Sequence, residues 1–152
     1  METEMLLQFK DLALGAVLGL SACGSAIGIG YSGQAAVGAW KKGFVRNKPV
    51  SLASLLVCVS APITQTFYGM ILMTQMQPLV GKGILLWFIA IFSGIAICLS
   101  AVNQGKIGAA AADALGESEK GFGNYLIALG IVESVAIFVM VFTLIVLKKL
   151  GA

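Results

Sequence analysis

Four long apolar stretches constrain the fold of this chain more than any other feature. They cover approximately residues 12–40, 50–77, 84–112 and 125–147. Each exceeds the ~20 residues that an α-helix needs to cross about 30 Å of hydrocarbon. A soluble four-helix bundle is excluded because the stretches lack polar faces and only 11% of the chain is charged. The sequence therefore predicts an all-α membrane protein with four transmembrane helices.

The use of histidine and cysteine excludes several kinds of site. The chain has no histidine, which excludes a histidine-based metal site or proton relay. Cys23, Cys58 and Cys98 all fall within apolar stretches, which is typical of small buried side chains rather than of a disulfide or metal set. We expect no cleavable signal peptide, since residues 1–11 are acidic rather than basic. Nothing in the sequence indicates a nucleic-acid partner.

The charges of the short polar segments predict the orientation in the membrane. Residues 41–49 contain four basic side chains and no acid: Lys41, Lys42, Arg46 and Lys48. Because an excess of Lys and Arg marks cytoplasmic loops, we expect loops 41–49 and 113–121 in the cytoplasm and both termini outside. Lys148 and Lys149, near the C-terminus, favour the opposite orientation.

The chain repeats itself after about seventy residues. That shift, taken without a gap, superimposes Gln34 on Gln104 and Ile63 on Glu133. It divides the chain into two helical hairpins, 1–78 without a membrane carboxylate and 79–152 with Glu133. An even number of helices separates the copies, so both hairpins have the same orientation, unlike the inverted repeats of many transporters.

The helices of each predicted hairpin differ in bulk. The first and third stretches are rich in closely spaced glycine, including Gly24, Gly28, Gly105 and Gly108. Such spacing lets helix backbones approach closely in lipid. The second and fourth stretches carry aromatic and large aliphatic side chains. This difference suits a homo-oligomeric ring with the first and third helices inside, although a monomeric four-helix bundle would also pack in this way.

Glu133 is the only carboxylate within the four apolar stretches. A charged side chain at the centre of a bilayer costs about 2.5–3.5 kcal/mol on insertion scales, and such residues usually mark function. We interpret Glu133 as an ion-binding carboxylate in a transport path. The alternative is a structural carboxylate that is neutral or paired. Lys106 is a poor counter-ion because it lies near the cytoplasmic end of its helix, where it can snorkel.

Oxygen-bearing residues gather at the expected depth of Glu133. Pro62 lacks an N–H group and predicts a kink that frees nearby backbone carbonyls. One helix face after this kink offers a carbonyl, a hydroxyl, an amide and a phenol, from Ala61, Thr64, Gln65 and Tyr68. Gln104 adds an amide from the third helix.

This set suits a hard monovalent cation. One carboxylate neutralises the charge, and neutral oxygens complete the shell. Five candidate oxygens exceed what a proton needs, so we favour Na⁺ over H⁺, with Tyr68 holding Glu133 toward the ion. Each residue also has a structural alternative. Thr64 can bond back to its own helix, Gln65 and Gln104 can join helices, and Tyr68 can simply pack.

These residues resemble the membrane-rotor proteolipid of V-type ATPases, the c or K subunit, in its sodium-pumping bacterial form. The resemblance covers the whole chain and rests on motifs in three helices. They are Ala61-Pro62-Ile63-Thr64-Gln65 with Phe67-Tyr68-Gly69, then Gln104-Gly105-Lys106, and finally Val132-Glu133-Ser134.

The resemblance implies a ring of identical copies in the plasma membrane, turned by cytoplasmic ATP hydrolysis. It implies a stator subunit whose arginine releases the ion, and a central stalk that docks on the cytoplasmic loops. The family's sodium ligands fall on Glu133, Thr64, Gln65, Gln104 and the carbonyl of Ala61. Tyr68 takes the position that donates a hydrogen bond to the glutamate.

Other functions stay open from the sequence. The same rotor can carry H⁺, or the chain can be a stand-alone four-helix transporter or channel, or a purely structural membrane protein. The chain contains no nucleotide-binding loop and no catalytic site, so ATP hydrolysis would belong to partner subunits.

Overall fold

The structure, a computed structural model, describes residues 2–82, 84–118 and 120–151, and all of the regular elements in this part are helical. Three helices are continuous: α1 (Glu2–Val45), α4 (Ile84–Ser118) and α5 (Phe122–Gly151). The second of the four membrane crossings predicted from the sequence is divided into shorter elements. They are α2 (Leu52–Ser60), the 3₁₀ turn η1 (Ala61–Ile63), α3 (Thr64–Met76) and the 3₁₀ segment η2 (Gln77–Lys82).

The all-α fold with four membrane-spanning helices is confirmed. In the described part of the chain, four segments are long and apolar enough to cross a membrane, judged by length and composition. They are Leu12–Val45, Leu52–Val80, Leu85–Ser118 and Phe122–Gly151. These are the features of a multi-pass membrane protein.

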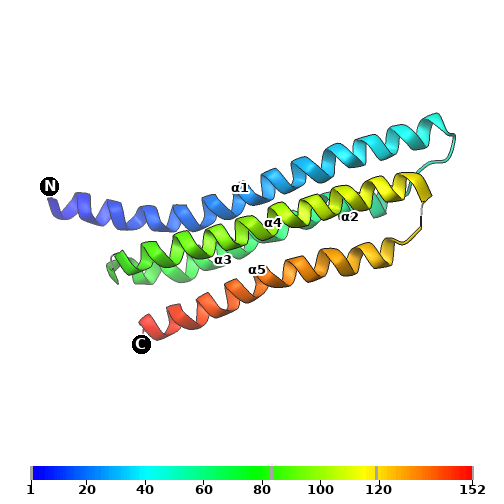
Figure 1. The fold of residues 1–152 in the computed structure, drawn as a ribbon. Helices are drawn as coiled ribbons and strands as arrows, with labels where there is room; N and C mark the ends of the chain where they lie inside the picture. The colour runs from blue at the N-terminus through cyan, green and yellow to red at the C-terminus, as the bar shows by residue number, and fades with distance from the viewer. Residues whose placement is uncertain (1, 83, 119, 152) are drawn as a thin grey trace.

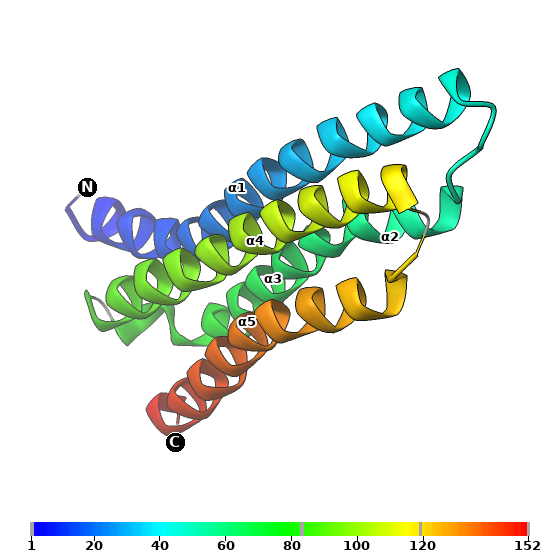
Figure 2. The ribbon, with the colours of Figure 1, turned by 45° about the vertical axis from the view of Figure 1, so that its right-hand side comes forward.

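The four crossings lie side by side as two hairpins (Figures 1 and 2). The first hairpin is α1 with α2–η1–α3, and the second is α4 with α5. The start of α1, the end of α5 and the η2 link lie at one end of the bundle, and the other two connections lie at the opposite end (Figure 1). The terminal residues Met1 and Ala152 lie outside the described residues.

The two polar connections are shorter than the sequence predicts. Residues 41–49 and 113–121 were expected as loops, but α1 continues to Val45 and α4 to Ser118. The helices extend because no residue before these points breaks the backbone hydrogen-bond pattern, and polar side chains are tolerated where a helix projects into water.

The end of α1 is fixed by local backbone chemistry. Asn47 adopts the left-handed conformation, with φ of 50°. The N–H of Asn47 donates to the carbonyl of Phe44 at 3.3 Å, and the N–H of Lys48 donates to that of Gly43 at 3.0 Å. This pairing is a Schellman motif, and Pro49 follows it because proline cannot continue a helix.

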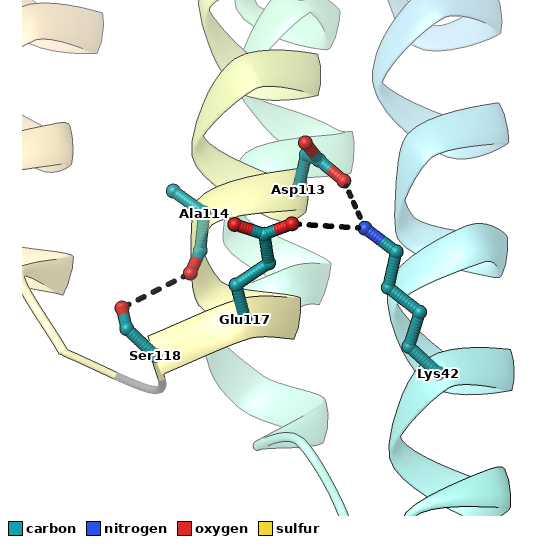
Figure 3. A network of polar contacts seen from close by, with 5 residues as sticks. All are labelled: Lys42, Asp113, Ala114, Glu117 and Ser118. Carbon is teal, nitrogen blue, oxygen red and sulfur yellow. Dashed lines mark hydrogen bonds and ion pairs between the residues drawn. The ribbon is translucent and has the colours of Figure 1, made fainter.

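An ion-pair network joins α1 to α4 at this end of the bundle (Figure 3). The Nζ atom of Lys42 lies 2.7 Å from Asp113 Oδ1 and 3.5 Å from Glu117 Oε1. All three side chains are exposed by more than a third. Water therefore screens the network, which aligns two helix ends without adding much stability.

α1 and α4 are packed backbone against backbone. A Cβ atom placed on Gly24 would lie 2.5 Å from the Cα of Cys98, and one placed on Gly105 would overlap the backbone of Gly28. A side chain at either glycine would force the helices apart. The glycine spacing in the sequence therefore serves close contact between these two helices within one chain.

The structure gives the internal repeat a different register on these two helices. The hydroxyl of Ser32 donates to the Val59 carbonyl at 3.4 Å, and the amide of Gln104 donates to the Leu129 carbonyl at 3.2 Å. The accepting residues are seventy positions apart, but the donors are seventy-two apart. The predicted pairing of Gln104 with Gln34 is therefore wrong: the counterpart of Gln104 is Ser32, and Gln34 is exposed.

The outer helices keep the predicted shift of seventy residues. Thr64 Oγ1 donates to the Ala61 carbonyl at 3.0 Å, and Ser134 Oγ donates to the Ile131 carbonyl at 2.7 Å. The repeat consequently contains a two-residue gap, which the longer connection after α1 accommodates. An ungapped alignment misses it because small apolar residues match in several registers.

Candidate functional site

The site begins at the break in the second crossing. Pro62 has no N–H group, so the carbonyl of Cys58 loses its partner within the helix. At this point one turn becomes the 3₁₀ turn η1, and Pro62 is buried. A Cβ atom placed on Gly108 of α4 would lie 2.5 Å from the Cys58 carbonyl oxygen. The glycine therefore allows α4 to approach the broken turn closely.

The first turn of α3 collects three oxygens. The Thr64 hydroxyl donates to the carbonyl of Ala61 at 3.0 Å and lies 3.1 Å from Gln65 Oε1. Thr64 thus bonds back to its own helix, which is the structural alternative considered for it. The Thr64 hydroxyl therefore lies close to both the carbonyl oxygen of Ala61 and the amide oxygen of Gln65, and three oxygens gather in this turn.

Two buried amides connect this turn to α4 and α5. Gln65 Nε2 donates to Gln104 Oε1 at 2.8 Å, and both side chains are 0% exposed. Gln104 Nε2 in turn donates to the Leu129 carbonyl at 3.2 Å and to Glu133 Oε2 at 3.4 Å. The amide pair therefore joins three helices and ends on the carboxylate.

Tyr68 completes the contacts of the carboxylate. Its hydroxyl donates to Glu133 Oε1 at 2.7 Å, the usual distance for a hydrogen bond from a hydroxyl group. One oxygen of Glu133 thus faces Tyr68 of α3, and the other faces Gln104 of α4. The carboxylate is partly buried, between the two hairpins of the chain.

All of the site residues proposed from the sequence lie in this one network. It runs from Ala61 through Thr64, Gln65 and Gln104 to Glu133, with Tyr68 on the far oxygen. Among the side chains that the structure describes, the ion pairs are those of Lys42, and none reaches Glu133. The Nζ atom of Lys106 instead lies 5.9 Å from the centre of the Tyr31 ring.

The chemistry of the site is that of hard oxygen ligands. Within the described residues, no group of three or more His, Cys, Asp or Glu side chains gathers to hold a metal ion. One carboxylate, two amides, a hydroxyl and a backbone carbonyl suit a single monovalent cation, and the carboxylate alone suits a proton. Soft or multiply charged metals are a poor match for one negative charge.

The sequence did not identify two further polar contacts. The hydroxyl of Ser100 donates to the Val132 carbonyl at 2.9 Å, next to Glu133 along α5. On the other side of α3, Thr66 donates to Ser25 of α1 at 2.8 Å. Ser100 precedes Gln104 by one helical turn and so shares its face, which was the available signal for a second polar contact with α5.

Residues 80–146 match the family model of the ATP synthase C subunit. The matched segment covers less than half of the chain and includes Gln104 and Glu133, but not the oxygens of η1 and α3. A comparison with curated proteins found no match.

Proposed function

We propose that this chain is an ion-carrying rotor subunit of a V-type rotary ATPase, and that Glu133 binds and releases Na⁺ as a ring of identical copies turns. The observation that supports it most directly is the hydrogen-bonded line of five oxygen-bearing groups that ends on the single membrane carboxylate. The similarity of residues 80–146 to the ATP synthase C subunit supports a rotor role.

The proposed sodium ligands are the carboxylate of Glu133, the side-chain oxygens of Thr64, Gln65 and Gln104, and the carbonyl of Ala61. Gln65 and Gln104 have no exposed surface. Gln104 Oε1 accepts from Gln65 Nε2 while Gln104 Nε2 faces Glu133, so the Gln104 amide must turn before its oxygen can bind an ion beside the carboxylate. Tyr68 keeps one oxygen of Glu133 occupied, which leaves the other oxygen directed toward Gln104. The hydrogen bond from Tyr68 orders the carboxylate before an ion binds, which reduces the entropy lost on binding.

The proposed assembly includes three kinds of partner. Copies of the chain form the ring, a stator subunit presents an arginine that competes for Glu133, and a central stalk docks on the end that carries the two polar connections. The position of the two polar connections supports the last assignment, because both lie at the same end of the bundle (Figure 1). The proposed ring lies in the plasma membrane, and the end that carries the two polar connections faces the cytoplasm.

The proposed direction is ATP-driven pumping. Ile63 occupies the position in the first hairpin that Glu133 occupies in the second. Fewer ions then cross per turn for a given number of helices. Each ion therefore receives a larger share of the free energy of ATP hydrolysis. Since moving one charge costs about 2.3 kcal/mol per 100 mV, a larger share allows each ion to be driven against a steeper gradient. Liposomes containing the whole complex test this: a gradient no steeper than that of a ring with one carboxylate per hairpin would contradict it.

Carbodiimide labelling of Glu133 tests the ion assignment. Carbodiimides modify protonated carboxyl groups in apolar surroundings, so bound Na⁺ should protect Glu133 at fixed pH. We expect protection by millimolar Na⁺ and none by K⁺. Glu133→Gln should remove the label, while Glu117→Gln, at a side chain that is 62% exposed, should leave it.

Each outcome of the labelling has a distinct meaning. Labelling that depends on pH alone would make the ion H⁺ and would reduce Gln65 and Gln104 to a structural link between helices. Labelling that is absent at every pH would contradict an ion-carrying role for Glu133 altogether.

A further inference from the structure

A groove of about 410 Å³ lies between α3, η2 and α5, at the end of the bundle that holds the start of α1 and the end of α5 (Figure 1). Its apolar walls include Ile71 of α3 together with Leu144 and Leu147 of α5. Gln75 of α3 and Lys148 of α5 also line it, and both of these polar side chains are exposed. The groove thus combines apolar walls with an amide and an ammonium group.

The depths of the groove residues on α5 match the layers of a bilayer. The midpoint of the crossing Phe122–Gly151 lies between residues 136 and 137. At a rise of 1.5 Å per residue, Leu144 is about 11 Å and Lys148 about 17 Å from this midpoint. The hydrocarbon core extends about 15 Å from the centre of a bilayer, and the headgroups extend to about 20–22 Å. Leu144 therefore lies at the level of acyl chains, and Lys148 lies at the level of headgroups.

The residues on α3 follow the same order. The crossing Leu52–Val80 has its midpoint at residue 66, which places Ile71 about 8 Å and Gln75 about 14 Å from the centre. Ile71 is therefore opposite acyl chains, and Gln75 lies at the edge of the hydrocarbon. Both walls of the groove change from apolar to polar at about the same depth, as a bound phospholipid does.

The charge of this groove is positive. Lys148 and Lys149 lie in the last turn of α5 and are exposed. Among the side chains that the structure describes, the ion pairs are those of Lys42. The sequences of α3, η2 and α5 contain one carboxylate, Glu133, which lies about 22 Å from Lys148 along α5. A cation beside an apolar groove at headgroup depth is complementary to an anionic lipid.

We propose that this groove binds one anionic phospholipid of the leaflet on the side of the two termini. The lipid phosphate contacts the ammonium group of Lys148, and the amide of Gln75 is a second donor. An acyl chain lies against Ile71 and Leu144. A zwitterionic lipid offers the same chains but no net charge, so Lys148 selects the anionic headgroup.

The proposal also accounts for a feature of the sequence that the rotor function does not explain. Lys148 and Lys149 stand at the end of the chain that the loop charges place outside, where an excess of basic residues is unfavourable. A bound anionic headgroup neutralises one of these charges. The inference does not depend on the rotor function: the groove is on the surface of a single chain, and in the proposed ring the bulky helices form the outer wall.

Quenching of tryptophan fluorescence by brominated lipids tests which lipid occupies the groove. Ile71→Trp places a reporter in the groove wall, in a background where the two native tryptophans are replaced by Trp40→Phe and Trp87→Phe. The assembled protein is reconstituted in phosphatidylcholine vesicles that contain increasing fractions of phosphatidylglycerol with brominated chains. We expect phosphatidylglycerol to bind about fivefold more tightly than phosphatidylcholine, the factor that one lysine near an anionic headgroup supplies.

Two lysine variants separate a specific groove from general attraction to a charged helix end. Lys148→Met should remove the preference for phosphatidylglycerol. Lys149→Met is the matched control, because Lys149 has the same charge in the same turn but does not line the groove, and this variant should keep the preference. An equal loss in both variants, or equal affinity for the two lipids in the parent reporter, would overturn the proposal.

Native mass spectrometry of protein with its natural tryptophans guards against a reporter that disturbs the groove. After release from the same vesicles, the parent and Lys149→Met should each retain one more phosphatidylglycerol per chain than Lys148→Met does. The same retention in all three would refute the groove as a lipid site. Carbodiimide labelling of Glu133 is a separate readout, so a failure of the lipid proposal leaves the sodium assignment intact and the reverse also holds.

Discussion

Tyr68→Phe isolates the hydrogen bond that orients the ion-binding carboxylate. The substitution keeps the ring, which packs against the core of the bundle, and removes only the hydroxyl that lies 2.7 Å from Glu133 Oε1. Hydrogen bonds to charged groups contribute about 1.5–3 kcal/mol. Glu133 still accepts from Gln104 at 3.4 Å in the variant, so we expect a loss near the lower limit.

A loss of about 1.5 kcal/mol corresponds to roughly tenfold weaker binding. The variant should therefore need about ten times more Na⁺ to protect Glu133 from carbodiimide at fixed pH. Tyr125→Phe is the matched control, because Tyr125 lies near the start of α5, away from the carboxylate, and should change nothing. Unchanged or tighter sodium binding in Tyr68→Phe would show that the phenol does not direct Glu133 toward the ion.

Three further substitutions test the packing and the limits of the site. Gly105→Val should destabilise the chain by about 1–3 kcal/mol, because its side chain would overlap the backbone of Gly28; thermal unfolding in detergent measures this. Lys42→Met should leave the unfolding temperature unchanged within error, since water screens its contact with Asp113. Gln34→Leu should leave sodium protection unchanged, because Gln34 is exposed on α1 and lies outside the network that reaches Glu133; a large loss would show that further residues act on the site.

The fold class was predictable because its cause is local. A stretch of more than twenty apolar residues leaves a membrane helix as the arrangement that satisfies its backbone. The helix ends were less predictable. The sequence indicated loops from residue 41 and from residue 113, but polarity does not end a helix. α1 ends at Val45 because Asn47 and Pro49 permit a Schellman motif, which depends on backbone geometry.

The members of the site were predictable, but the links between them were not. Spacing along one helix places Thr64, Gln65 and Tyr68 on a shared face, so their proximity follows from helix geometry. The distance from Gln65 to Gln104 depends on how two helices pack, and Gly108 allows that approach by having no side chain. The ungapped register of the internal repeat was wrong on α1 and α4 for the same reason. The hydrogen bond from Ser32 to the Val59 carbonyl depends on how two helices pack, which an alignment of the sequence with itself does not show.

In the proposed ring, duplication gives two kinds of junction between hairpins, one within a chain and one between neighbouring copies, which a ring of single hairpins cannot have. In a ring of identical hairpins every junction is the same, so a carboxylate at one position appears at all of them. Four changes would act together at the proposed junction between copies, because Ile63, Ser32, Val135 and Phe138 stand where the site within the chain has a carboxylate, two amides and a phenol. Restoring the carboxylate alone at residue 63 would bury a charge beside apolar groups, at about 2.5–3.5 kcal/mol. In the proposed ring the loss would therefore be self-reinforcing, because Ile63, Val135 and Phe138 would each make the return of any single ligand at that junction unfavourable.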